Sequence, residues 1–166
     1  MTAAVDLRKH LEQSFAFLFN EFGFDKESLS QTEGEDEISI QFKSKTVGVR
    51  IILDLRDQYP FVFISELTEN KEFPEKLGEI TPNTEIHEFD LDDIVWIQSR
   101  EEPYSHSSGL DLTKGIKEQA KKLKKYGKDV LSGDFDVFND LDEIVKERAH
   151  EAASNKWGSS HAKKLC

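Results

Sequence analysis

Residues 38–64 read ISIQFKSKTVGVRIILDLRDQYPFVFI, and this stretch decides the fold class. Apolar residues take every second position over 38–42 and again over 47–53, which is the period of a β-strand with one buried face. The polar step at Ser44 and Lys45 between the two runs predicts an antiparallel hairpin. The run FVFI at 61–64 follows turn residues at 57–60 and is continuously apolar, which predicts a central strand or one covered on both faces.

A helix is expected before this sheet, with loops on either side of the strands. Residues 5–22 carry a helical stripe, and Gly23 is a typical residue for the end of a helix; the stripe consists of Leu7, Leu11, Phe15, Leu18 and Phe22. Residues 25–36 are polar and contain serine, glycine and acidic side chains, so we expect a loop there. Residues 68–88 hold no period and predict a loop with a short helical turn at 74–77.

Helices are also expected after the strands. Asp90 has the features of an N-cap for a short apolar helix through Ile97, and residues 100–109 have the composition of a linker. Asp111 is the expected cap of a helix that continues to 131. Asn139 is the expected cap of a last helix whose inward side chains are Leu141, Ile144 and Val145.

Together these elements predict an α+β fold. We expect an antiparallel sheet of three or four strands, an N-terminal amphipathic helix and two to three C-terminal helices. Residues 1–153 are expected to form a single α+β domain, and residues 154–166 a flexible C-terminal tail, because no pattern continues beyond Trp157.

Composition narrows the classes of partner. The chain has 166 residues, with 22 Lys plus Arg against 33 Asp plus Glu, a net charge of −11. This charge makes nucleic acid an unlikely partner, and the absence of a long apolar run argues against a membrane. The single cysteine, Cys166, rules out an intramolecular disulfide, and charged residues at Asp6, Arg8 and Lys9 interrupt any export signal. We therefore expect a cytoplasmic protein.

Two features suggest a surface for a protein partner. The acidic residues Glu33, Glu35, Asp36 and Glu37 would steer a basic protein. Phe17 and Phe19 lie off the main stripe of the first helix, where they either join the core or face a partner. The same acids would also serve solubility alone.

Lysines gather on the helix predicted over 111–131. They stand at 114, 117, 121, 124, 125 and 128, along one helical face. Three interpretations stay open: a solvated face or one near the protein's own acidic loops, a contact with phosphate or nucleic acid, or a docking surface for an acidic partner protein.

No motif fixes a reaction. The chain lacks glycine-rich phosphate loops and a serine nucleophile motif, and Cys166 stands at the terminus, so no catalytic residue and no cofactor are predicted. The best candidates for metal ligands in the sequence are His87, Asp90, Asp92 and Asp93. We therefore expect a non-enzymatic, acidic protein-binding module, such as an immunity, inhibitor or regulatory protein of bacterial type. The alternatives are a metal-binding enzyme that uses these carboxylates and a structural homo-oligomer, for example a homodimer.

Overall fold

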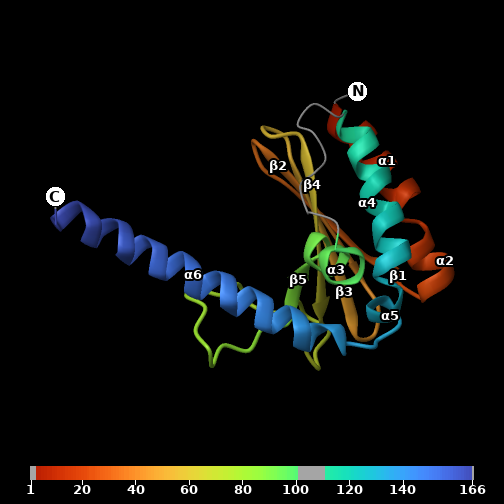
Figure 1. Cartoon of the computed structure of the whole chain (residues 1–166). Helices are drawn as coiled ribbons and strands as arrows, with labels where there is room; N and C mark the ends of the chain where they lie inside the picture. The colour runs from red at the N-terminus through yellow and green to blue at the C-terminus, as the bar shows by residue number, and fades with distance from the viewer. Residues whose placement is uncertain (1–2, 101–110, 166) are drawn as a thin grey trace.

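A five-stranded antiparallel sheet forms the centre of the protein, seen edge-on in Figure 1, in a computed structural model that describes residues 3–100 and 111–165. The strands are β1 Asp25–Glu33, β2 Glu37–Lys43, β3 Val47–Asp54, β4 Tyr59–Glu66 and β5 Glu88–Asp90, and they lie side by side in chain order. The predicted hairpin is confirmed as β2 and β3, in which Ile40 pairs with Ile51, and Ile51 pairs in turn with Val62 of β4. The predicted α+β class with an antiparallel sheet is therefore confirmed.

The sheet has more strands than the three or four predicted. β1 occupies residues that we expected to form a loop, and it pairs with β2 from Glu33 opposite Ile38 to Asp25 opposite Lys43, with an irregularity in between. An edge strand takes its conformation from backbone hydrogen bonds to one neighbour, so it needs no apolar alternation. β5 is too short to show a period, and the predicted helical turn at 74–77 is absent from the structure.

The predicted first helix is divided in two. α1 spans Ala3–Ser14 and α2 spans Phe17–Phe22, with Phe15 and Ala16 between them. The break lets both Phe15 and Phe19 reach Phe42 of β2, with ring centroids 6.1 and 5.6 Å apart. Gly23 ends α2 in the left-handed conformation, at φ 70°, as predicted.

The helices after the sheet number four in the described residues, not two to three. They are α3 Leu91–Ser99, α4 Leu112–Tyr126, α5 Lys128–Leu131 and α6 Val137–Leu165. Two of the three predicted caps are confirmed, because the Asp90 side chain accepts from the Asp92 backbone N–H at 2.9 Å and Asp111 accepts from the Thr113 backbone N–H at 3.0 Å. The predicted linker falls almost entirely on residues 101–110, outside the described residues.

Two details of these helices differ from the prediction. The single helix expected to 131 breaks at Gly127, where a Cβ would stand 2.8 Å from the Leu123 carbonyl oxygen. The last helix begins at Val137, so Asn139 lies inside it and does not cap it. α6 then continues to Leu165 and projects beyond the sheet in Figure 1, so the segment predicted as a tail is helical there; its flexibility stays a prediction.

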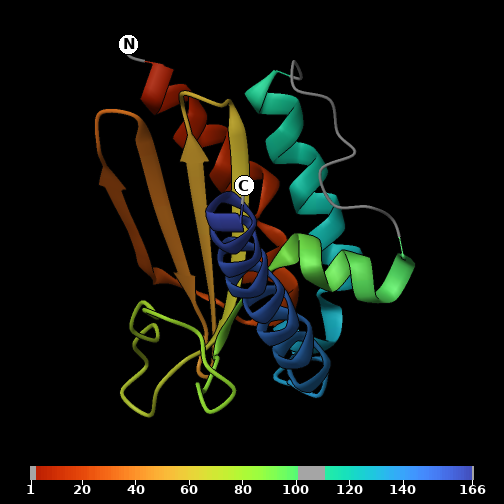
Figure 2. The same ribbon diagram turned by 60° about the vertical axis from the view of Figure 1, so that its left-hand side comes forward.

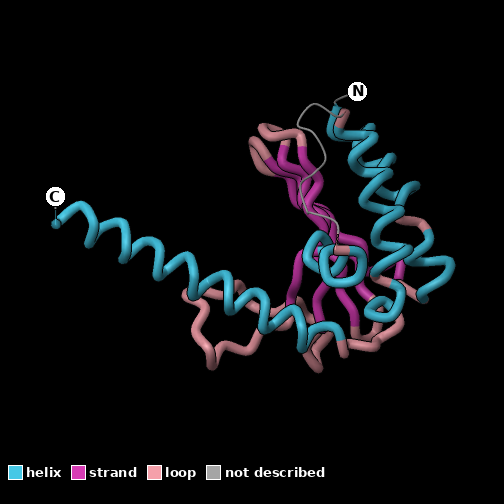
Figure 3. Tube along the Cα trace, in the orientation of Figure 1, coloured by secondary structure: helices cyan, strands magenta, loops and turns pink. Residues whose placement is uncertain are grey.

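The core lies on one face of the sheet. α1 and α4 cover that face, as the turned view in Figure 2 and the trace in Figure 3 both show. The buried side chains of the strands point into this layer and include Ile38, Ile40, Phe42, Val49, Ile51, Leu53, Val62 and Ile64. No described helix packs along the strands on the opposite face, which we call the uncovered face although the irregular segment 67–87 lies against one end of it.

None of the described helices has the length and apolarity that crossing a bilayer requires.

Candidate functional site

Aromatic and aliphatic side chains lie across the uncovered face. Ile52 of β3 stands opposite Phe61 of β4, and Arg50 stands opposite Phe63. The Tyr59 and Phe61 rings meet edge to face at 4.7 Å, and the Phe61 and Phe63 centroids are 6.5 Å apart. All five side chains are half-buried. The apolar run at 61–64 therefore belongs to a strand with neighbours on both sides, but helices cover only one of its faces, contrary to the second option in the prediction.

A charged network crosses the middle of this face. The Arg50 guanidinium donates to a carboxylate oxygen of Glu88 and lies 5.3 Å from the centroid of the Phe63 ring. Ser65, which is fully buried, donates from its hydroxyl to the other oxygen of Glu88 at 2.6 Å. The short strand β5 therefore places Glu88 where its carboxylate neutralises Arg50. We call the group formed by Arg50, Glu88 and the Phe63 ring the platform.

The irregular segment 67–87 packs against one end of this platform. A Cβ on Gly48 of β3 would stand 2.6 Å from the Phe73 ring and 2.7 Å from a methyl carbon of Leu67, so only glycine admits the segment at this distance. The Leu67 backbone N–H donates to the Thr46 carbonyl at 2.8 Å, and Lys43 lies 5.5 Å from the Phe73 centroid. The segment is thus attached to the sheet although it has no regular structure.

Sheet and segment together enclose a pocket of about 570 Å³. Its apolar side chains come from both parts, and Leu77 of the segment, at 45% exposure, is the one exposed large hydrophobic residue in the described part of the chain. Acidic side chains outnumber basic ones around it. The full lining is Glu37, Arg50, Ile52, Phe63, Pro74, Glu75, Lys76, Leu77, Glu85, His87 and Glu88. Such a pocket suits a group with an apolar body and a positive end.

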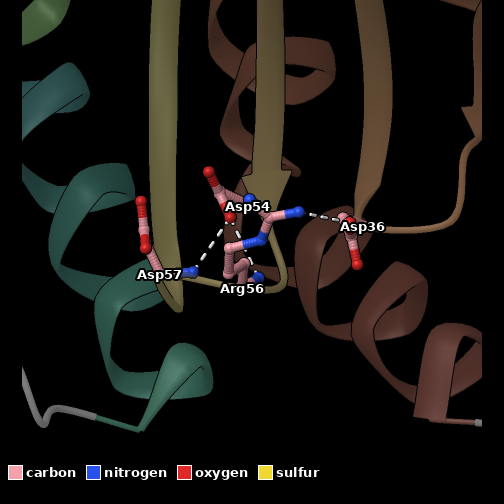
Figure 4. A network of polar contacts seen from close by, with 4 residues as sticks. All are labelled: Asp36, Asp54, Arg56 and Asp57. Carbon is pink, nitrogen blue, oxygen red and sulfur yellow. Dashed lines mark hydrogen bonds and ion pairs between the residues drawn. The ribbon is translucent and has the colours of Figure 1, made fainter.

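The predicted acidic cluster lies at the β1–β2 turn. Glu33, Glu35 and Glu37 are exposed there, and Asp36 accepts from the Arg56 guanidinium at 2.9 Å. Figure 4 shows that Asp54 supports the same corner, because its carboxylate accepts from the backbone N–H groups of Arg56 and Asp57, each at 2.9 Å. Of the four predicted acids, Glu37 alone lines the pocket.

Phe17 and Phe19, the other predicted partner-binding residues, lie on the helical side of the sheet. Both are half-buried against the core, with the Phe17 ring 6.1 Å from Phe15 and the Phe19 ring 5.6 Å from Phe42. α2 lies next to the start of β1, whereas the acidic turn lies at the end of the same strand. The structure therefore does not bring these two groups of predicted residues together.

The predicted metal ligands have other partners. The carboxylate of Asp92 accepts from the Tyr59 hydroxyl at 2.7 Å, Asp93 pairs with Arg148 of α6, and Asp90 caps α3. His87 lies between two acids, 3.5 Å from Glu66 and 3.6 Å from Glu85. Among residues 3–100 and 111–165, no three His, Cys, Asp or Glu side chains gather to hold a metal ion, so the geometry adds no support for this site.

Asp90 has an altered proton affinity. Burial raises the pKa of its carboxyl from 3.8 to about 7, with further increases from the charges of Asp92 and Asp93. The backbone hydrogen bond from Asp92 and the charge of Arg148 act in the opposite direction and lower this pKa. Burial and the neighbouring charges of Asp92 and Asp93 therefore disfavour the ionised form of Asp90.

The main pocket residues were not predicted from the sequence. Arg50, Phe63 and Leu77 have no motif around them, but Ile52 gives a signal because it takes a polar position in the alternation of β3. Comparison of the chain with protein-family models, with curated proteins and with solved structures found no match in any of the three.

Proposed function

We propose that the protein is a binding module that receives a basic, apolar segment of a partner protein on its uncovered sheet face. The observation that carries this proposal is the pocket itself, in which Ile52, Phe63 and Leu77 are surrounded by the carboxylates of Glu37 and Glu75. A contiguous apolar patch with a polar rim is typical of a protein interface. The net charge of −11 favours basic partners through steering.

The role proposed for the module is regulation or inhibition of its partner, without chemistry of its own. Binding would bury the half-exposed rings of Phe61 and Phe63 and the side chain of Leu77, which supplies the apolar part of the affinity. The carboxylates around the pocket supply selectivity for lysine or arginine over acidic side chains. An immunity-type inhibitor of a basic toxin is one kind of protein with this combination.

A short peptide of alternating arginine and leucine tests the proposal. We expect fluorescence anisotropy to show saturable binding of the labelled peptide, and no binding of the same peptide with glutamate in place of arginine. Leu77→Ser and Glu75→Gln should each weaken binding by roughly five- to tenfold, which corresponds to about 1–1.4 kcal/mol. Both residues are exposed, so neither change removes a core contact.

The matched control is Glu72→Gln. Glu72 is exposed in the same segment and carries the same charge, but it does not line the pocket. We expect this variant to bind the peptide within about twofold of the wild type. If Glu72→Gln and Glu75→Gln weaken binding equally, the attraction is one of overall charge and the pocket is not the site.

The attachment of segment 67–87 can be tested at Gly48. Gly48→Ala should push the Phe73 ring off the sheet, destabilise the protein by about 1–2 kcal/mol and weaken peptide binding, because the pocket loses its wall. Trypsin should then cleave faster at Lys71 and Lys76. Gly78→Ala is the control, since a Cβ there meets nothing within 4 Å. Equal cleavage and stability in both variants would show that Phe73 does not hold the segment.

A further inference from the structure

A groove lies between the first two helices and α4, on the opposite side of the sheet from the uncovered face. It has a volume of about 350 Å³. Its lining is Gln13, Ser14, Phe17, Lys117, Ala120, Lys121 and Lys124. The groove therefore combines an aromatic ring and a small apolar side chain with lysine ammonium groups.

The lysines of this groove have little charge compensation from the protein itself. Lys124 pairs with Glu21 at 3.1 Å and lies 5.7 Å from the Phe17 centroid. Lys117 and Lys121 are exposed and form no ion pair within the described part of the chain. Lysines four residues apart repel each other along a helix. Lys117 and Lys121 therefore gain no stabilisation from an ion pair with a described residue, although the chain has 33 acidic residues in all.

The chemistry of the groove favours an acidic peptide over a polyanion such as nucleic acid. Phe17 is the one aromatic residue in the lining, so no row of rings is present on which successive bases would stack. Apolar surface at Phe17 and Ala120 gains from a hydrophobic side chain, which a phosphate backbone lacks. The two unpaired ammonium groups gain from carboxylates on the same segment.

We propose that this groove is a second binding site, which takes an acidic segment of a partner protein that carries an aromatic or aliphatic side chain. The site is independent of the uncovered face, and it selects the opposite charge. The protein would then hold a basic segment on one side of its sheet and an acidic segment on the other. The lysine face of α4 would then have a binding function of its own, separate from the binding of a basic partner.

The test uses a labelled peptide of alternating aspartate and phenylalanine, measured by fluorescence anisotropy at low salt and at about 0.15 M salt. The double variant Lys117→Gln/Lys121→Gln should weaken binding at least tenfold. The double variant Lys125→Gln/Lys128→Gln has the same net charge, but it changes exposed lysines outside the groove, and we expect binding within about twofold of the wild type. Circular dichroism verifies that both double variants keep their helices.

Three results would overturn this proposal. Equal weakening by the two double variants would show attraction to charge alone. Competition by a single-stranded RNA oligonucleotide at lower concentration than the unlabelled peptide would show a polyanion site. Self-association in light scattering that Lys117→Gln/Lys121→Gln abolishes would show that a second copy of this chain fills the groove. The arginine and leucine peptide should bind Lys117→Gln/Lys121→Gln as it binds the wild type, so failure of one site is distinguishable from failure of the other.

Discussion

Asp90→Asn is expected to stabilise the protein by about 4 kcal/mol at pH 8.5 and to have little effect near pH 3.5. Asparagine keeps the cap of α3, because its side-chain oxygen also accepts from the Asp92 backbone N–H. It carries no charge, so the cost of ionising a buried group beside Asp92 and Asp93 disappears. The measurement is urea unfolding of both proteins across this pH range.

The sign follows from the two pKa values of the Asp90 carboxyl. In the folded protein the pKa is about 7, whereas its ordinary value is 3.8, so the folded state holds the proton more tightly. The stability that this proton contributes is fully present below pH 3.8 and is lost as the pH rises through 7. The advantage of the asparagine variant should therefore develop between about pH 4 and pH 7.

Asp111→Asn is the matched control for this experiment. Asp111 caps α4 through the Thr113 backbone N–H at 3.0 Å, but it is exposed to solvent. The same substitution at this cap should change stability by less than about 1 kcal/mol at every pH. If Asp90→Asn and Asp111→Asn give parallel pH profiles, burial at the start of α3 is not the source of the effect.

Phe42→Ala is expected to destabilise the protein by about 4 kcal/mol, because it leaves a cavity in the covered layer of the sheet. Phe42 is fully buried and contacts the rings of Phe15 and Phe19. Phe61 lies on the other face of the sheet, half-buried, with no helix opposite it. Phe61→Ala should therefore cost only about 1 kcal/mol, as measured by urea unfolding.

The pair of variants tests whether one face of the sheet is free. Both replace phenylalanine by alanine in the middle of a strand, so backbone propensity changes by a similar amount. A cost for Phe61→Ala as large as that for Phe42→Ala would mean that another layer covers Phe61 in solution. The uncovered face would then already be occupied, and a partner could not bind there.

Local patterns were sufficient to predict the centre of the fold. The alternation through Ile40 and Ile51 predicted β2 and β3 because each strand buries one of its faces, so apolar side chains recur at every second position. The caps at Asp90 and Asp111 were predicted because a capping carboxylate acts within its own turn of chain.

The rest depends on contacts between distant residues. β1 is a polar edge strand, so its pairing with β2 leaves no apolar period in residues 25–33. The pocket forms because segment 67–87 returns over the sheet and Phe73 meets Gly48, a contact that no local pattern encodes. Two signals were available in the sequence. Gly48 inside a strand indicates that another part of the chain approaches closely, and Ile52 at a polar position indicates a partly buried face. Neither signal identifies the segment that approaches.

The predicted acidic cluster at the β1–β2 turn lies outside both proposed binding sites except for Glu37. Asp36 is engaged with Arg56, and an exposed pair of this kind contributes little to stability. In the proposed function, the acids at the β1–β2 turn would add to the field that attracts a basic partner, while the pocket beside Glu37 would supply the apolar contact. Affinity is expected to depend on the pocket and association rate on the turn.

The most direct test of the binding face is a titration of the isotopically labelled protein with the arginine and leucine peptide, followed by amide chemical shifts in NMR spectra. If the peptide binds the uncovered face, saturable shifts are expected at Arg50, Ile52 and Phe63 and in residues 74–77 and 85–88, with α2 and α4 unaffected. Shifts confined to residues 33–36, or to the helices on the covered face, would contradict the claim that the uncovered sheet face is the binding site.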